Sequence, residues 1–305
     1  MTDTVAGIKY IYEYDSLGRL IRGEQKKTGD NSTSMYLENR FDECGRSSGG
    51  SYVLGSKTLN YDIEYEDGSD LVPYYTFPDN TVNSYVYDAF DRLTYKKYHN
   101  LAYYSAYQYY SPSSAATSSL VSLQYNNYNG GTSKYDYTYD ILGNITEIYE
   151  NNVLKLSYVY DSLNQLVREN NAYANKTWVY TYDLSGNITA RKEYAYTTGT
   201  LPASYTQKLY SYSTGSWGDM LTSYDGTTIS YDAIGNPTNW RNATSLTWNG
   251  RTLTNQSISS TNSLSYGYNS DGIRTNKHYN SSSDMISRSY QYILDRTRII
   301  YEKQQ

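Results

Sequence analysis

The sequence predicts an all-β protein made of tandem antiparallel β-hairpins. One pattern, Tyr-x-Tyr-Asp-x-x-Gly-(Arg/Asn)-(Leu/Ile), recurs along the chain. Tyrosine, which favours strands, supplies 42 of the 305 residues. No segment shows the apolar periodicity of an amphipathic helix. A single hairpin is marginally stable, so this repeat predicts hairpins that are stabilised by their neighbours.

The copies of the pattern differ mainly at the first positions and at the glycine. They run over Tyr12–Leu20, Asn39–Arg46, Tyr85–Leu93, Tyr137–Ile145, Tyr158–Leu166, Tyr180–Ile188, Ile229–Pro237 and Tyr266–Arg274. Two copies replace the glycine with Asp91 and Asn164, and these residue types tolerate a left-handed backbone better than other non-glycine residues.

Asp opens each predicted turn and Gly closes it. In a type I turn the Asp carboxylate can accept an N–H two residues on, and Gly takes the left-handed position of the bulge that follows. We therefore predict a structural turn role for Asp15, Gly18, Asp42, Gly45, Asp140, Gly143, Asp183, Gly186, Asp232, Gly235 and Gly272. The pairs Asp67-Gly68, Asp225-Gly226 and Asn249-Gly250 predict tighter, two-residue turns.

Tyrosines that are two residues apart fall on one face of a strand. We predict that they form a packing ladder between neighbouring hairpins, with hydroxyls bonded to the backbone or to water. The ladder residues are Tyr12, Tyr14, Tyr137, Tyr139, Tyr158, Tyr160, Tyr180, Tyr182, Tyr266 and Tyr268. The alternative is that exposed tyrosine faces stack on sugar rings.

We predict a single repeat array over residues 1–305, with no separate catalytic or toxin domain. Successive turns such as Asp140 and Asp161 stand about 20 residues apart, the length of one hairpin with its return connection. No shift in composition marks a domain boundary, and the most loop-like segment is 111–119. No apolar run is long enough for a membrane span, and no secretory signal is visible.

The sequence predicts no catalytic, metal-binding or cofactor-binding residue, and so neither an enzyme nor a cofactor. His99 and His278 lack a nucleophile signature, and Cys44 has no neighbouring His to activate it. The turn aspartates recur with each hairpin, whereas a catalytic carboxylate pair would occur once. A net charge of −5 and a single Lys96-Lys97 pair argue against nucleic-acid binding.

These repeats resemble the YD-repeat, or rearrangement-hotspot (RHS), protein family. The resemblance covers essentially the whole chain, and Ser216–Pro237 and Leu246–Leu253 are similar to the late part of such an array in bacterial members. It implies a continuous curved sheet that winds as a spiral into a hollow shell around a C-terminal toxin or effector domain. It also implies flanking shell, core and effector domains as partners, and a secreted or cell-surface location.

The chain departs from the family pattern at its end. It has no Asp-Pro-x-Gly motif, which closes the shell in the family, and Arg296 stands where the family pattern has glycine. We therefore expect a non-enzymatic, encapsulating segment of a shell, whose open sheet edges allow self-association. The alternative function is a carbohydrate- or cell-wall-binding adhesive repeat protein, and an uncharacterised hydrolase is a third hypothesis.

Overall fold

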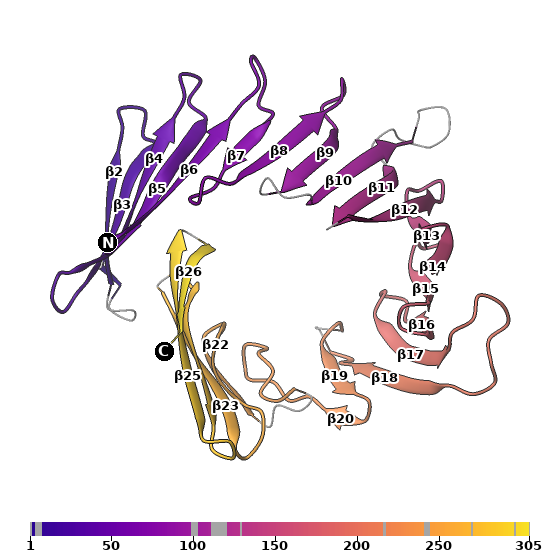
Figure 1. Ribbon diagram of the computed structural model, residues 1–305. Coiled ribbons are helices and arrows are strands. Elements are labelled where there is room, and N and C mark those ends of the chain that lie inside the picture. The colour runs from indigo at the N-terminus through magenta and orange to yellow at the C-terminus, as the bar shows by residue number, and fades with distance from the viewer. Residues whose placement is uncertain are drawn as a thin grey trace. The chain divides into compact units, whose positions relative to one another are not determined.

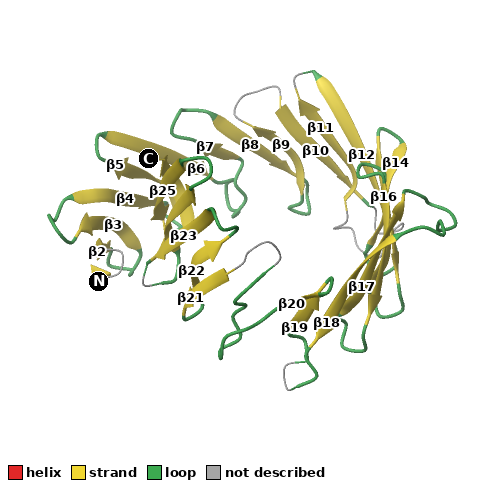
Figure 2. Ribbon diagram, turned by 90° about the horizontal axis from the view of Figure 1, so that it is seen from below, coloured by secondary structure: helices red, strands yellow, loops and turns green. Residues whose placement is uncertain are grey.

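The chain forms β-strands and no helix over the residues that its structure describes (Figure 2). The structure, a computed structural model, describes residues 2–3, 8–98, 103–110, 121–128, 130–215, 218–240, 245–269, 271–295 and 297–304. The loop-like segment 111–119, His99 and Arg296 lie outside these ranges. Strands that follow one another in the chain pair antiparallel, as in β12–β13 and β23–β24. The predicted all-β array of antiparallel hairpins is confirmed.

The chain divides into two compact units, and unit 1 combines Met1–Asp62 with Thr227–Gln305. Its first segment carries β1 (Thr2–Asp3), β2 (Ile8–Tyr14), β3 (Leu20–Lys27), β4 (Thr33–Phe41), β5 (Ser47–Leu54) and β6 (Lys57–Glu64). Its second segment carries β20 (Thr227–Thr228), β21 (Ser245–Asn249), β22 (Thr252–Ser257), β23 (Asn262–Tyr268), β24 (Arg274–Ser281), β25 (Ile286–Asp295) and β26 (Arg298–Gln304). Strands β21–β26 form a six-stranded sheet, drawn in orange to yellow in Figure 1.

Unit 2 spans Ile63–Gly226. Its strands are β7 (Tyr74–Thr76), β8 (Val82–Tyr87), β9 (Leu93–Tyr98), β10 (Tyr103–Tyr109), β11 (Val121–Tyr128), β12 (Gly131–Tyr139), β13 (Ile145–Glu150), β14 (Val153–Tyr160), β15 (Leu166–Asn171), β16 (Lys176–Tyr182), β17 (Ile188–Ala195), β18 (Thr206–Tyr212) and β19 (Leu221–Tyr224). They lie side by side in chain order (Figure 1). Successive connections therefore lie alternately at the two opposite ends of the strands.

The motif hairpins carry a bulge just before the aspartate. In β12–β13, Thr138 pairs with Glu147 but Tyr139 pairs with Ile145, so the register shifts by one residue. The same shift occurs in β2–β3, β4–β5, β8–β9, β14–β15, β16–β17 and β23–β24. The unpaired residue, Thr146 in β12–β13, lies on the strand after the turn, and a bulge bends the strand that carries it.

One of the three predicted two-residue turns is wrong by one residue. Asn249 pairs with Thr252, so the turn consists of Gly250 and Arg251 rather than Asn249 and Gly250. Gly250, with φ 57°, takes the first central position of this turn, where a type II′ turn favours glycine. At Asp225-Gly226 both φ angles are positive, 52° and 79°, as a type I′ turn requires. Asp67 and Gly68 are the central residues of a turn in which the Ser69 N–H donates to the Glu66 carbonyl at 3.2 Å.

Both units bury apolar and polar side chains, and most of the buried apolar ones belong to unit 1. Unit 1 buries apolar residues such as Met35, Ile229 and Leu294. Unit 2 buries a polar cluster around Thr177, which is 0% exposed and whose Oγ1 lies 3.0 Å from the Thr197 carbonyl and 3.1 Å from Asn170 Oδ1. Because these buried polar atoms have partners, the sheet tolerates an interior with few aliphatic side chains.

Candidate functional site

The repeated turn is a regular polar arrangement, shown by the hairpin β12–β13. Asp140 Oδ1 accepts the main-chain N–H groups of Leu142 and Asn144, each at 2.9 Å, and Oδ2 accepts the Asn144 side-chain amide at 2.9 Å. Main-chain bonds join Gly143 N to Asp140 O and Asp140 N to Asn144 O. The Asn144 amide, together with the main-chain N–H groups, lowers the pKa of Asp140. The carboxylate is therefore an ionised acceptor that is occupied within its own turn.

The side chain four positions after the aspartate is the second half of this arrangement. Arg19 Nε donates to Asp15 Oδ2 at 2.6 Å, and the Arg19 main-chain N–H donates to Asp15 Oδ1 at 2.9 Å. Equivalent pairs are Asp42–Arg46, Asp88–Arg92, Asp183–Asn187 and Asp232–Asn236. The Arg/Asn position of the sequence pattern signals this role, but sequence reasoning did not assign it. Gln165 is an exception, since only its main-chain N–H reaches Asp161.

The third residue after the turn aspartate has a left-handed backbone. Gly143 and Gly186 both have φ 87°. The other predicted turn glycines have similar angles: Gly18 77°, Gly45 86°, Gly235 84° and Gly272 74°. Asp91 and Asn164 take the same conformation, with φ 59° and 66°. Gly272 follows Asn269 rather than an aspartate, and Asn269 Oδ1 accepts the Ile273 N–H at 2.8 Å.

The tyrosine directly before the aspartate reaches the preceding hairpin. The Tyr160 hydroxyl donates to the Ile145 carbonyl at 3.0 Å, and the Tyr182 hydroxyl donates to the Leu166 carbonyl at 2.6 Å. Equivalent bonds join Tyr87 to Val72, Tyr109 to Leu93, Tyr139 to Val121, Tyr212 to Ile188 and Tyr268 to Leu253. We call this bond, from a tyrosine hydroxyl to a main-chain carbonyl of the preceding hairpin, the tyrosine clamp.

The predicted ladder tyrosines two positions earlier do not make this bond. Tyr137 and Tyr266 hydroxyls donate to the side-chain oxygens of Gln124 and Gln256, at 3.3 and 3.4 Å. Burial raises the pKa of Tyr158, and it raises the pKa of Tyr180 to about 12. These hydroxyls are therefore neutral donors at physiological pH.

The two ladder tyrosines of the first hairpin, Tyr12 and Tyr14, differ from the others in their exposure and their contacts. Tyr14 is 58% exposed, and its hydroxyl bonds to nothing in the described part of the chain. The Tyr12 ring stacks on Tyr10 with centroids 6.3 Å apart, and burial followed by the Asp271 charge raises the pKa of Tyr12.

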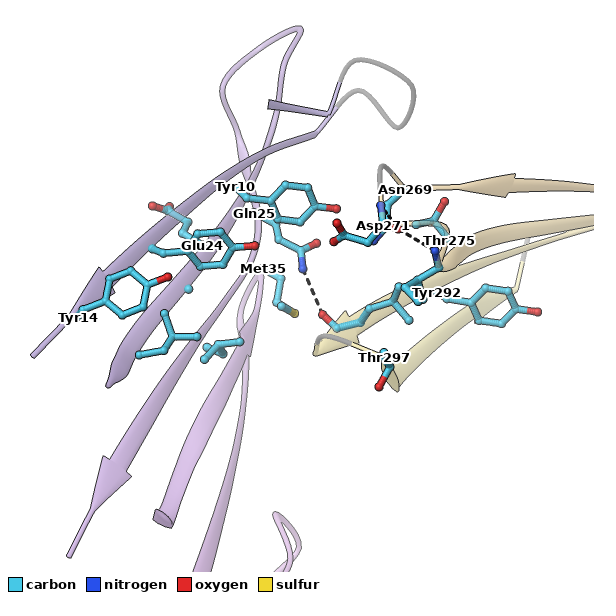
Figure 3. A pocket seen from close by; sticks show the side chains of 16 residues that line it. Tyr10, Tyr14, Glu24, Gln25, Met35, Asn269, Asp271, Thr275, Tyr292 and Thr297 are labelled. Carbon is cyan, nitrogen blue, oxygen red and sulfur yellow. Dashed lines mark hydrogen bonds between the residues drawn. The ribbon is translucent and has the colours of Figure 1, made fainter. Parts of the chain in front are cut away.

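A pocket of about 500 Å³ lies in unit 1 beside these tyrosines (Figure 3). Strands β2–β4 form one wall, with Tyr12 and Met35, and the second segment of the unit forms the other, with Asp271 and Tyr292. A mostly apolar lining with a few polar groups is typical of small-molecule pockets of this size.

The polar groups of this pocket are largely occupied. Glu24 accepts the Thr33 hydroxyl at 2.6 Å, and this bond, with the nearby Lys26 charge, lowers the pKa of Glu24. Gln25 Nε2 donates to the Leu294 carbonyl at 3.1 Å and joins the two segments of the unit. An ionised, bonded Glu24 lacks the raised pKa that a general acid requires.

The other chemically reactive side chains are scattered. Cys44 is exposed and free in its turn, and His278 Nδ1 lies 2.8 Å from Ser289 Oγ. Lys96 Nζ lies 4.4 Å from the centroid of the Tyr98 ring. Within the described ranges, no three His, Cys, Asp or Glu residues gather closely enough to hold a metal ion. No helix in the same ranges is long and apolar enough to cross a bilayer.

Similarity to known proteins is found in structure and not in sequence. No protein-family model matches the chain, and no curated protein matches it. TcdB2-TccC3-TEV is 16% identical with a TM-score of 0.69 over 93% of this chain and 16% of that chain. TcdB2-TccC3 without its hypervariable C-terminal region is 14% identical with a TM-score of 0.55 over 94% and 19%.

A third similar structure is the Tc holotoxin pore of Photorhabdus luminescens with a mutated TccC3. It is 14% identical with a TM-score of 0.57 over 93% of this chain and 19% of that chain. The chain thus spans less than a fifth of the length of these three structures. At this identity the likeness establishes the fold, and the chain has the hairpin-repeat fold that its resemblance to YD-repeat proteins implied.

Proposed function

We propose that this chain is a non-enzymatic, encapsulating segment of a YD-repeat shell in a secreted or cell-surface, toxin-associated bacterial protein. The observation that carries the proposal is the repetition of one turn and one clamp in both units. A catalytic site needs a singular set of groups, whereas a wall needs the same bonds at every hairpin. In this protein the turn residues and the ladder tyrosines are structural.

The proposed partners are the neighbouring parts of a larger assembly. The similar structures include a Tc holotoxin pore, and this chain matches only 16% to 19% of each of the chains described above. This supports flanking shell and core domains, with an effector domain as the enclosed cargo. One of those structures was solved without a hypervariable C-terminal region, which supports a variable cargo in this protein too.

Electron microscopy of the purified chain tests the wall, and an activity screen tests the absence of chemistry. We expect a curved sheet of antiparallel strands and no turnover of chromogenic glycosides or esters. A straight fibre or a disordered chain would overturn the shell proposal. Turnover that survives repurification and disappears with one substitution near the pocket would overturn the non-enzymatic part.

The second candidate function is carbohydrate binding, and the pocket in unit 1 favours it. The stacked Tyr10 and Tyr12 rings beside an open volume of about 500 Å³ offer a flat aromatic face to a sugar ring. Co-sedimentation with insoluble polysaccharides and peptidoglycan separates the two functions. Pelleting that Tyr12→Ala abolishes would favour the adhesive function, and pelleting no higher than that of a control protein would remove it.

A further inference from the structure

The pocket in unit 1 contains one charged side chain that the repeat does not require. Asp271 lies two positions after Asn269, the first residue of the turn between β23 and β24. The same position is uncharged in the other copies of the pattern, where it holds Leu17, Cys44, Phe90, Leu142, Leu163, Ser185 and Ile234. Asn269 Oδ1 accepts the main-chain N–H groups of Asp271 and Ile273, so the turn does not use the Asp271 carboxylate.

The Asp271 carboxylate is an unpaired charge at this pocket (Figure 3). Its residue is exposed, and within the described ranges the carboxylate has neither a hydrogen bond nor an ion pair. The other acidic lining residue, Glu24, already has the Thr33 hydroxyl and the Lys26 ammonium group as partners. None of the residues that line the pocket is a lysine or an arginine. A cation that enters the pocket therefore meets a carboxylate without a partner.

The wall formed by β2 presents tyrosine rings. Tyr10, Tyr12 and Tyr14 are two residues apart and so fall on one face of the strand, and the planes of the first two rings differ by 6°. Among the described residues no lysine or arginine side chain lies over the Tyr12 ring. On the other wall the Arg274 guanidinium already lies 5.5 Å from the centroid of the Tyr292 ring. Tyr12 is therefore the ring that a cationic ligand can use.

Gly23 keeps the pocket open beside Tyr12. Gly23 is buried in β3 and pairs with Tyr12 on one side and with Leu37 on the other. Its φ lies outside the left-handed region, so the backbone does not require glycine here. An added Cβ would lie 3.4 Å from Leu37 Cγ and 3.6 Å from Tyr12 Cδ1. A larger side chain would fill the space between these two residues, which glycine leaves to a ligand.

We propose that this pocket binds a small organic ammonium ion, with the Asp271 carboxylate beside the charged nitrogen and the Tyr12 ring against the adjoining carbon atoms. An ammonium group is attracted to the face of a tyrosine ring and, by charge, to a carboxylate. Met35 and Leu37 offer apolar surface to the rest of the ligand, and a volume of about 500 Å³ suits a small molecule.

This ligand class differs from that of the carbohydrate alternative for the same pocket. A neutral sugar can stack on Tyr12 but brings no positive charge to Asp271. The inference does not rest on the shell function, since a shell segment can have such a pocket or lack it.

Ligand-observed NMR titration of the full chain tests the ligand class. The probes are n-pentylammonium, butyltrimethylammonium, the neutral 1-pentanol and methyl glucoside. We expect an ammonium ion to bind about tenfold more tightly than 1-pentanol. Binding of either ammonium probe supports the proposal, and the comparison between them separates a primary amine from a quaternary group. No binding of either probe, or equal binding of 1-pentanol, would overturn it.

Two substitutions test the assigned residues. Asp271→Asn and Tyr12→Leu should each weaken ammonium binding about fivefold, and Asp271→Asn should leave 1-pentanol binding unchanged. Glu43→Gln is the matched control for charge, at an exposed turn position of the same unit. Tyr74→Leu is the control for the ring, since Tyr74 is 46% exposed and Tyr12 is 45% exposed.

Circular dichroism checks that all four variants are folded. Equal weakening in the controls, or wild-type ammonium binding by folded Asp271→Asn, would overturn the proposal. Methyl glucoside binding without a preference for ammonium would also overturn it, in favour of the carbohydrate function. None of these results bears on the shell function, which electron microscopy tests separately.

Discussion

The side-chain partner of the turn aspartate differs along the chain. Asp15 has the Arg19 guanidinium, which can only donate, whereas Asp140 has the Asn144 amide, which carries both a donor and an acceptor. An asparagine in place of Asp140 can keep its side-chain bond if the amides of Asn144 and of Asn164, which accepts a second bond from Asn144, both rotate. An asparagine in place of Asp15 turns a donor toward Arg19 and loses the charge.

Asp15→Asn should therefore lower the melting temperature more than Asp140→Asn does. Thermal unfolding followed by circular dichroism measures both variants beside the wild type. Asp161→Asn is the control, since Asp161 receives main-chain N–H groups and no donor from the Gln165 side chain. A larger loss in Asp140→Asn than in Asp15→Asn would show that the partner at the fourth position does not determine the strength of the turn.

Gly143→Val should destabilise the chain by about 1–2 kcal/mol, the cost of a left-handed backbone in a residue with a Cβ. No heavy atom lies within 4 Å of the Cβ that would be added, so this cost is conformational and not a clash. Asp91→Gly, at the equivalent turn position where φ is 59°, should be close to neutral. Urea denaturation measures both, and a Gly143→Val chain as stable as the wild type would contradict the left-handed requirement.

Most motif hairpins of unit 2 are joined to the one before by main-chain pairing and by the tyrosine clamp. In unit 2 the carbonyls of Leu93, Val121, Ile145, Leu166 and Ile188 that accept the clamp each belong to the first residue of a strand. That residue follows the turn, where the bulge interrupts regular pairing. The clamp therefore supplies a donor at the point where the ladder of the hairpin is irregular.

Tyr160→Phe should cost about 1 kcal/mol, because it removes the clamp donor and keeps the ring. Tyr14→Phe is the matched control: Tyr14 occupies the same motif position, but its hydroxyl bonds to no described residue. Urea unfolding of the two variants gives the difference directly. Equal stability of the two would mean that the clamp does not hold neighbouring hairpins together.

The sequence predicts the hairpins well because turn chemistry is local. Asp and Gly three residues apart predict a turn independently of the rest of the fold. The alternation of tyrosines predicts strands. Tyrosine hydroxyls bonded to the backbone between neighbouring hairpins were predicted, but the carbonyls that accept these bonds were not, because donor and acceptor lie 15 to 24 residues apart on different hairpins. Tyr109 and Tyr212 also make the clamp without a Tyr-Asp pair to signal it.

The organisation of the chain into two units was beyond the sequence for a different reason. Met1–Asp62 belongs with Thr227–Gln305 through contacts such as that of Gln25 with the Leu294 carbonyl, 269 positions away. No composition change marks either boundary, because both units are built from the same repeat. The pocket in unit 1 was missed for the same reason, since its walls come from both segments of that unit.

The stability of a chain with 42 tyrosines should depend on alkaline pH. Burial raises the pKa of Tyr180 to about 12, whereas an unfolded tyrosine titrates near about 10. The folded state holds the proton more tightly, so this contribution to stability is complete below about pH 10 and is lost as pH rises through about 12.

We therefore expect the free energy of unfolding to fall between about pH 10 and 12, together with the absorbance change of tyrosinate. Urea denaturation at a series of alkaline pH values measures it. Tyr180→Phe should reduce the fall, because one of the two tyrosines whose pKa is raised to about 12, Tyr173 and Tyr180, is absent. A stability that stays constant across this range would contradict a wall stabilised by neutral, half-buried phenols.

The central claim is that the repeated polar groups hold neighbouring hairpins together rather than forming a site. Amide hydrogen exchange of the wild type and Tyr182→Phe tests it most directly. We predict faster exchange in both Leu166–Asn171 and Lys176–Tyr182, the two strands that this clamp joins, and unchanged exchange in β23–β25. Faster exchange confined to Lys176–Tyr182, or no change in either strand, would contradict the account.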